Sequence, residues 1–584
     1  MGPPKPSPAT LTATPSGRLL RRAREVAASA WRRNRGTALR LLPTLLTVAL
    51  VGRMLLAIHA TFLRPAAPMN MQDEGYVTAF AARMLEGRFL PYVDAVSHRG
   101  PVLYVVAALA VAVGGRDSFV PIRALSFVCS VLVVVLAYVA ALRARRPLAG
   151  ALAAVGVFVV CGLEMSPHDG LAYNGEVLLD VFALGALVCL VSGLGRGPEP
   201  EAAPSRHLPL WTAAAGVLAS LGALSKQVGV VDVLSLSLWP LAAAVARRRG
   251  SLLWSYAAGA VAPVALVLAR YASAGELRTL WFYLVTYNTD YYMAPLTADE
   301  AMHRYRVWFS DHSALSVGAI AVVSFGVGRA LDASAAASRG TGAGRFWRTL
   351  DERGFLLSVA VAALLTGAAS NATARGFGHY FVQAVPWLAL LLGLVLEEGL
   401  LSEAGSRRRQ LAVELGMLVP TLALVGWLFL PKLHDLREAS GGHHSTLPIC
   451  EVVSRRTTAA DRIYVWGFAP DIYVYCNRVP ASRYVYSTFQ SGLIPSFEGA
   501  TPEEDRRRTV PGSREAFLDD LEQSKARLVI DIPWTLSNRS IDGTPEYAAY
   551  LSQHYCPPTV FERDGWARTR IWERKVDGVA CLAE

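Results

Sequence analysis

Charged side chains interrupt an otherwise apolar chain at a few places, first in "MQDEGYVTAFAARMLEGRFLPYVDAVSHRGP", residues 71–101. Asp73 and Glu74 lie near its start, and His98 and Arg99 lie near its end. A positioned carboxylate can act as a general base, and a cation can stabilise charge that develops on a phosphate. The same two acids could instead cap a helix N-terminus, where the helix dipole favours carboxylates. Helical periodicity alone favours capping.

A second polar stretch, "EMSPHDGLAYNGEVLLD", contains His168, Asp169 and Glu176. Glu176 begins the next apolar run, where an ionisable group is costly unless it faces a polar cavity. Helix capping is again the alternative. Two acidic loops that face one compartment can form a paired acid site or a cation site. Asp73 and Glu176 are therefore candidate ligands of a divalent metal, and the sequence indicates no other cofactor.

Two further polar positions adjoin apolar runs. Lys226, in "LGALSKQVGVV", is the only lysine between Lys5 and Lys432. It could supply a point charge for a phosphate group, or its side chain could extend to the membrane interface. His379 and Tyr380, in "RGFGHYFVQAVPWLALLLG", suit phosphate recognition or proton chemistry, with interfacial anchoring as the alternative.

The elements that carry these residues are mostly membrane helices. The 584 residues are 53% hydrophobic and 18% charged, whereas soluble domains carry about 25% charged residues. Apolar runs near the length of about 20 residues that spans a bilayer recur at 38–62, 119–142, 147–163, 176–194, 210–225, 228–246, 251–272, 313–331, 354–370, 379–397 and 411–431. We predict an all-α polytopic membrane protein with about 11–13 transmembrane helices. The run 101–115 is predicted to be re-entrant, with a missed span nearby as the alternative.

The distribution of arginine predicts the topology. The formal charge is +11, and the basic residues gather in the N-terminal tail and in short loops, which is the positive-inside pattern and not a nucleic-acid-binding surface. We therefore predict a multi-pass protein of the cell (inner) membrane with a cytoplasmic N-terminus. The predicted regions are a basic tail (1–37), a membrane domain (38–431) with outer loops 64–100, 164–175 and 273–312, and an extracytoplasmic domain (432–584).

Two of the outer segments have a recognisable character. "DEGYVTAFAARMLEGR" places Tyr76, Phe80, Met84 and Leu85 at helical spacing, which predicts an amphipathic helix lying on the membrane surface. The loop 273–312 is rich in aromatic residues, which favours an interfacial belt, with a lining for sugar or lipid as the alternative.

The C-terminal region is predicted to be a soluble α/β domain. "DRIYVWG" and "ARLVIDIP" have the pattern of buried strands, and "SREAFLDDLEQS" has that of an amphipathic helix. Four cysteines lie in this region, at 450, 476, 556 and 581. An even number outside the cytoplasm is consistent with two disulfides, with reduced structural thiols as the alternative. The spacing leaves the pairing open.

Five stretches together resemble the integral-membrane glycosyltransferases of the C superfamily. They are "DEGYVTAFAARMLEGRFLPYVD", "HRGPVLY", "YNGEVLLDVFALGAL", "LGALSKQVG" and "GHYFVQAVPWLALL". The most similar groups are the protein O-mannosyltransferase-like and aminoarabinose-transferase-like enzymes. Each motif is weak alone, but their order and common sidedness extend the resemblance over residues 38–431. The chain departs from the family where "HRGP" replaces a Lys-Pro-Pro stretch and where the second acid is a glutamate.

The resemblance implies transfer of a sugar from a polyprenyl-phosphate donor to a lipid, glycan or protein acceptor outside the membrane. It implies that Asp73 is the base for inverting attack, that Glu74 supports it, and that Glu176 is the second-loop acid. Binding of substrate and of the leaving phosphate is expected from Tyr76, His98, Arg99, His168, Asp169, Lys226, His379 and Tyr380. The alternatives are a transporter or flippase of a lipid-linked saccharide and a non-enzymatic assembly protein. Membrane lipids are the other expected partners.

Overall fold

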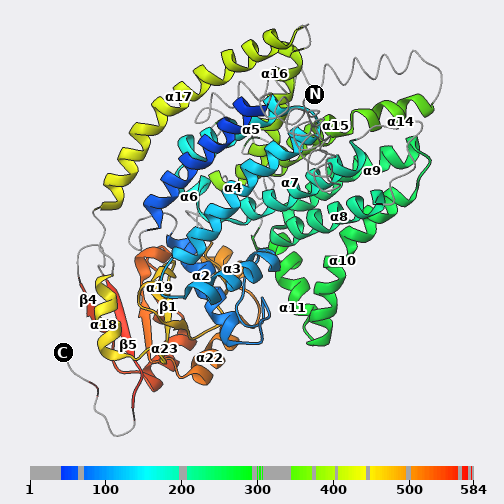
Figure 1. Ribbon diagram of the computed structural model, residues 1–584. Helices are drawn as coiled ribbons and strands as arrows, with labels where there is room; N and C mark the ends of the chain where they lie inside the picture. The colour runs from blue at the N-terminus through cyan, green and yellow to red at the C-terminus, as the bar shows by residue number, and fades with distance from the viewer. Residues whose placement is uncertain are drawn as a thin grey trace, which may run out of the picture.

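The computed structural model describes residues 41–63, 71–195, 207–292, 343–370, 377–401, 406–441, 447–494, 502–562 and 568–576, with positions 299, 302, 303, 306 and 581. Within them a long helical bundle carries a small mixed domain at one end (Figure 1). The predicted class, a polytopic membrane protein with a C-terminal α/β domain, is confirmed.

Nine helices of the described part are long and apolar enough to cross a membrane. They are Leu41–Phe62, α4 (Val120–Arg143), α5 (Pro147–Val157) with η1 (Phe158–Glu164), α7 (Gly175–Leu194), α8 (Leu208–Ser225), η2 (Gln227–Gly229) with α9 (Val230–Ala246), α10 (Ser251–Ser273), η4 (Gly378–Ala384) with α16 (Val385–Leu401), and most of α17 (Arg407–Gly441). A tenth span results if α14 (Ala343–Glu352) and α15 (Gly354–Ala369), bent by 81°, count as one. The predicted run 313–331 lies outside the described residues.

The short run after "HRG" forms α3 (Pro101–Gly114), a helix of 14 residues. At 1.5 Å per residue such a helix is about 21 Å long, shorter than the hydrocarbon core of about 30 Å. Its length therefore agrees with the prediction of a segment that does not cross the membrane.

The C-terminal domain contains a five-stranded sheet of order β2-β1-β3-β5-β4. Its strands are β1 (Arg462–Trp466), β2 (Val479–Pro480), β3 (Leu528–Asp531), β4 (Thr559–Phe561) and β5 (Thr569–Glu573). β1 is parallel to β2 and β3, whereas β5 is antiparallel to β3 and β4. The predicted strands at β1 and β3 and the predicted helix at α22 (Ser513–Ser524) are confirmed. α17 continues to Gly441, past the predicted domain boundary at 432.

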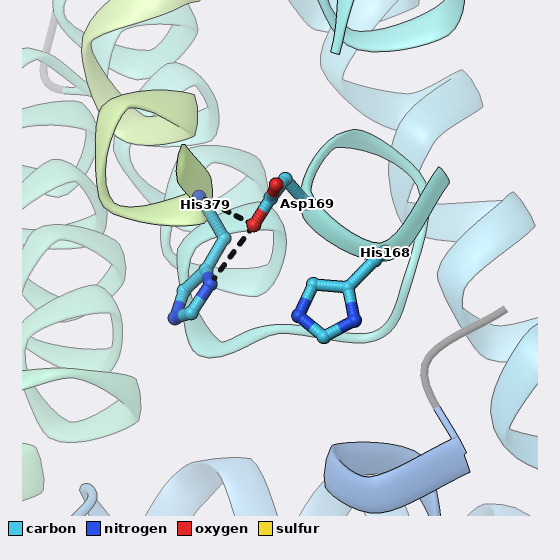
Figure 2. Close-up of side chains that lie close together, drawn as sticks. All are labelled: His168, Asp169 and His379. Carbon is cyan, nitrogen blue, oxygen red and sulfur yellow. Dashed lines mark hydrogen bonds and ion pairs between the residues drawn. The ribbon is translucent and has the colours of Figure 1, made fainter. Parts of the chain in front are cut away.

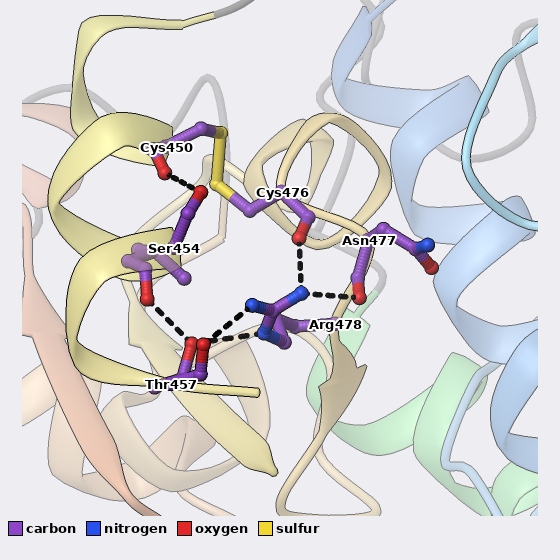
Figure 3. The surroundings of a disulfide bond; sticks show 7 residues. Cys450, Ser454, Thr457, Cys476, Asn477 and Arg478 are labelled. Carbon is purple, nitrogen blue, oxygen red and sulfur yellow. Dashed lines mark hydrogen bonds between the residues drawn. A yellow bond between two sulfur atoms is a disulfide. The ribbon is translucent and has the colours of Figure 1, made fainter. Parts of the chain in front are cut away.

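Two disulfides form within this domain, as predicted. Cys450 pairs with Cys476 and Cys556 pairs with Cys581, so the alternative of reduced thiols is wrong. The first bond joins α18 (Pro448–Arg456) to the end of α19 (Asp471–Tyr475), as Figure 3 shows. Beside it the Arg478 guanidinium donates to the carbonyl oxygens of Cys476 and Thr457 (2.8 and 3.0 Å), which lie at the C-terminal ends of α19 and α18.

The helix α2 (Met71–Glu86) differs most from its prediction. Every residue from Glu74 to Ala82 is buried, so the helix does not lie with one face on a membrane surface. α3 covers one side of it and α19 of the C-terminal domain covers another. The periodicity correctly predicted a helix with an apolar face. It did not show that a domain almost 400 residues later would cover the remaining face.

Candidate active site

A cavity lies where the helical bundle meets the C-terminal domain. Its water-accessible volume is about 120 Å³, and it opens to solvent. It is lined by Gln72, Asp73, Tyr76, His98, Arg99, His168, Tyr292, Phe377, His379, Tyr380, Tyr486, Thr488, Phe489 and Ile494. Six other residues predicted for the site, from four separate segments, therefore share one cavity with Asp73.

Asp73 and Arg99 form an ion pair in this cavity. Arg99 donates through Nη2 to Oδ1 of Asp73 at 2.6 Å, and the two side chains are 19% and 17% exposed. Burial acts to lower the pKa of Arg99, but the charge of Asp73 outweighs it and raises the pKa well above its usual value. Arg99 Nη1 is buried and has no hydrogen-bond partner in the described part of the chain. Arg99 is thus a permanent cation with donor capacity to spare.

Glu74 lies beside Asp73 in the sequence but outside the cavity. Its Oε2 accepts from Arg123 Nε of α4 at 3.0 Å, and both side chains are almost completely buried. Arg123 also donates to the Phe62 carbonyl oxygen at 2.8 Å, so the pair ties α2 to two membrane helices. This geometry favours a structural role for Glu74, because the carboxylate is enclosed with its own cation, and the predicted support of Asp73 or the acceptor stays a prediction.

Glu176 and Lys226 are also paired, one layer behind the cavity wall. Lys226 Nζ donates to Glu176 and lies 4.0 Å from the centre of the Tyr380 ring. The Tyr380 hydroxyl lies 3.1 Å from that of Tyr292, and both rings line the cavity. Burial lowers the pKa of Lys226, and the charge of Glu176 opposes this effect. Lys226 therefore lies behind the Tyr380 ring and is not among the residues that line the cavity.

Gly100 allows the "HRGP" stretch to approach the end of α8 closely. A Cβ on Gly100 would lie 2.1 Å from the Leu224 carbonyl oxygen at the end of α8, so only glycine fits. Gln227 Nε2 donates to the His98 carbonyl oxygen at 2.6 Å, which holds the same loop from the other side of Lys226. Gly100 thus allows the loop with Arg99 to pack against the segment with Lys226.

His168, Asp169 and His379 gather at one edge of the cavity, as Figure 2 shows. Asp169 Oδ1 accepts from the His379 backbone N–H at 3.1 Å and lies 3.3 Å from His379 Nδ1. Burial alone would raise the pKa of Asp169, but hydrogen bonds from His379 and Ser166 outweigh it, so the pKa is lowered. Asp169 therefore stays ionised and orients the His379 ring.

The same three side chains fit a divalent metal. Their ligand atoms lie within 4.8 Å of one another. Two imidazole nitrogens and one carboxylate oxygen suit zinc better than magnesium. Ligand atoms of a tetrahedral zinc site lie about 3.4 Å apart, so these side chains would have to move slightly closer together to bind the ion. Asp73 and Glu176, the ligands predicted from the sequence, are instead bonded to Arg99 and Lys226. The predicted ligands Asp73 and Glu176 stay a prediction, and His168, Asp169 and His379 form a second candidate set.

The C-terminal domain contributes part of the cavity wall. Tyr486, Thr488, Phe489 and Ile494 form one wall of the cavity, and Tyr486 stacks on Tyr76 with ring centres 4.3 Å apart. No motif marks these positions.

The aromatic loop also differs from its first interpretation as an interfacial belt. Tyr283, Tyr287 and Tyr292 of η3 (Phe282–Tyr292) are buried, and Tyr287 packs on Phe489 of the C-terminal domain. Tyr292 also lines the cavity, which agrees with the alternative that this loop lines a site for sugar or lipid.

Comparison with known proteins gives structural likeness alone. No family model and no curated protein match the chain. ArnT from Cupriavidus metallidurans bound to undecaprenyl phosphate is 14% identical with a TM-score of 0.51, over 92% of this chain and 99% of that one. Its apo form gives 14% and 0.52, over 94% and 98%. The Archaeoglobus fulgidus oligosaccharyltransferase is 12% identical with a TM-score of 0.44, over 91% and 74%. The chain therefore has the fold of ArnT across almost its whole length, which is the fold that the sequence resemblance implied.

Proposed function

We propose that this protein transfers a sugar from a polyprenyl-phosphate donor to an acceptor hydroxyl at the outer face of the membrane. The observation that carries the proposal is the cavity in which Asp73, Arg99 and His379 meet, at the end of an ArnT-like bundle. The ArnT structure holds undecaprenyl phosphate, which has the chemistry of the carrier lipid that the donor proposed for this chain would release.

The chemistry assigned to the cavity is a single inverting displacement. Asp73 accepts the proton of the acceptor hydroxyl, whose oxygen attacks the anomeric carbon. The bond from that carbon to the phosphate oxygen breaks, and polyprenyl phosphate leaves with the electron pair. Arg99 and His379 stabilise the charge on the leaving phosphate, and Lys226 adds to the positive potential from behind Tyr380.

A transporter of lipid-linked saccharides is the second candidate. Transporters place charges near the middle of the membrane, on interrupted helices. Asp180 and Asp232 are buried acids within α7 and α9, but each lies in the first two turns, near the Glu176–Lys226 pair. Their place at the cavity end of the bundle supports a reaction site there. Mass spectrometry of the envelope glycans and lipids of a deletion strain tests the proposal. If the transferase is missing, the glycans should lack one sugar, and that sugar should accumulate on its polyprenyl-phosphate carrier.

Metal removal should expose the role of the His168–Asp169–His379 cluster. When bound, a divalent ion would supply positive charge at this edge of the cavity. We expect the purified protein to hold about one zinc equivalent after dialysis, and Asp169→Ala to hold less than a tenth of it. Elemental analysis measures both, and His434→Ala, which removes an exposed histidine on α17, is the control. Equal zinc content in wild type and Asp169→Ala would show that the cluster binds no zinc and that Asp169 only forms hydrogen bonds with His379.

Gly100→Ala should displace the loop that carries Arg99. The new methyl would collide with the Leu224 carbonyl, which costs about 1–3 kcal/mol if the loop moves aside. We expect affinity for undecaprenyl phosphate to fall about tenfold, measured by titration in nanodiscs. Gly52→Ala is the matched control, since a Cβ there meets nothing within 4 Å. Equal affinity in the two variants would remove loop position from the binding site.

A further inference from the structure

We propose that the C-terminal domain positions Asp73, by holding the first turn of α2 on both sides of this residue. Tyr486 holds the turn before Asp73, and the start of α19 holds it after Asp73. The inference rests on the proposed role of Asp73 as the base. It adds Tyr486 as a positioning residue in a domain for which the sequence suggested no chemistry.

Tyr486 makes the first of the two contacts. Its hydroxyl donates to the Gln72 carbonyl oxygen at 2.9 Å, directly before Asp73 in the chain. Its ring stacks on Tyr76 at an interplanar angle of 3°, and Phe468 packs edge-on at 5.7 Å from the other side. Tyr486 therefore binds α2 by its hydroxyl and its ring together, and a sliding movement would break both contacts.

The second contact is a close approach of two backbones. A Cβ on Gly75 would lie 2.6 Å from the backbone nitrogen of Asp471, the first residue of α19. α19 is itself fixed, because the Cys450–Cys476 disulfide joins its C-terminal end to α18 (Figure 3). In addition, the Val465 backbone N–H of β1 donates to the Tyr473 hydroxyl at 2.8 Å. The domain thus presents a rigid surface to α2.

These contacts bear on Asp73 because its partner belongs to the membrane domain. Arg99 lies on the loop that leads into α3, and Glu74 is tied to Arg123 of α4. The first turn of α2 is therefore held between the bundle and the C-terminal domain. A displacement of about 1 Å at a reacting group can reduce the rate about a hundredfold. Loss of one of the two contacts should cost less, since the other remains.

Tyr486→Phe tests the inference, because it removes the hydroxyl and keeps the ring stack. Turnover is followed as polyprenyl phosphate released from a total lipid extract of the producing cells. We expect kcat to fall about tenfold, with donor KM, undecaprenyl phosphate affinity and melting temperature unchanged.

Tyr550→Phe is the matched control. It removes a tyrosine hydroxyl that donates to Glu522 at 2.9 Å on the exposed side of the same domain. Unchanged kcat in Tyr486→Phe, or a parallel loss of kcat, affinity and melting temperature, would overturn the positioning role. If instead Asp73→Asn transfers sugar at the wild-type rate, the proposed base itself fails, which separates the two outcomes.

Discussion

Asp73→Asn is expected to lower sugar transfer about a thousandfold and to leave binding of undecaprenyl phosphate within twofold of wild type. The amide has the shape of the carboxylate and can still accept from Arg99 Nη2, but it cannot take a proton from the acceptor. General base catalysis contributes about 10²–10⁴-fold to a rate, which sets the expected loss. The measurement is the initial rate of polyprenyl phosphate release by protein reconstituted in liposomes.

The same substitution at Asp290 provides the control. Asp290 is exposed on η3, where its carboxylate accepts from Thr289 Oγ1 at 2.6 Å, and it does not line the cavity. Asp290→Asn should retain the wild-type rate. Wild-type transfer by folded Asp73→Asn would remove this carboxylate from the mechanism.

Glu74→Ala should have the largest effect on stability. It leaves Arg123 buried without its counter-charge, and breaking one partner of a buried pair costs about 3–5 kcal/mol. We expect a clear drop in melting temperature and a poor yield of folded protein. The double variant Glu74→Leu/Arg123→Met should recover most of the loss, because apolar replacement of a buried pair is often neutral.

Glu74 and Asp73 can be distinguished by what each variant retains. Glu74→Ala protein that remains folded should keep measurable transfer, whereas Asp73→Asn should keep its melting temperature and lose transfer. A Glu74 variant of normal stability and a thousandfold lower rate would restore the catalytic role predicted from the sequence.

The length of the apolar runs predicted the membrane helices well. A bilayer span requires about 20 consecutive apolar residues, and this is a local property of the sequence. Each predicted span from 119–142 to 251–272 has its helix. The placement of Lys226, Arg99 and Asp73 near one end of the bundle was also predicted, because loops between successive spans alternate between the two sides. In these cases the physical constraint acts along the chain.

The errors arose where the constraint acts between distant segments. Tyr486 bonds to Gln72 across 414 residues, and nothing near either residue indicates the other. Glu74 had the sequence context of a capping or catalytic acid, but its environment is set by Arg123 of α4. The unusual "HRGP" stretch was visible in the sequence. The need for glycine at position 100 was not, because it comes from the Leu224 carbonyl oxygen on another helix. The ion-pair partner of a buried charged residue is set by the packing of distant segments. It therefore cannot be predicted from the residues on either side of it in the sequence.

The most direct measurement follows one lipid through one reaction. Protein reconstituted in liposomes is supplied with total lipid extract from the producing cells, and mass spectrometry quantifies each polyprenyl species over time. Sugar transfer predicts that a sugar-linked polyprenyl phosphate is consumed while polyprenyl phosphate and a glycosylated product appear in equal amounts. A sugar-linked polyprenyl phosphate that stays intact while no glycosylated product appears would contradict the transferase.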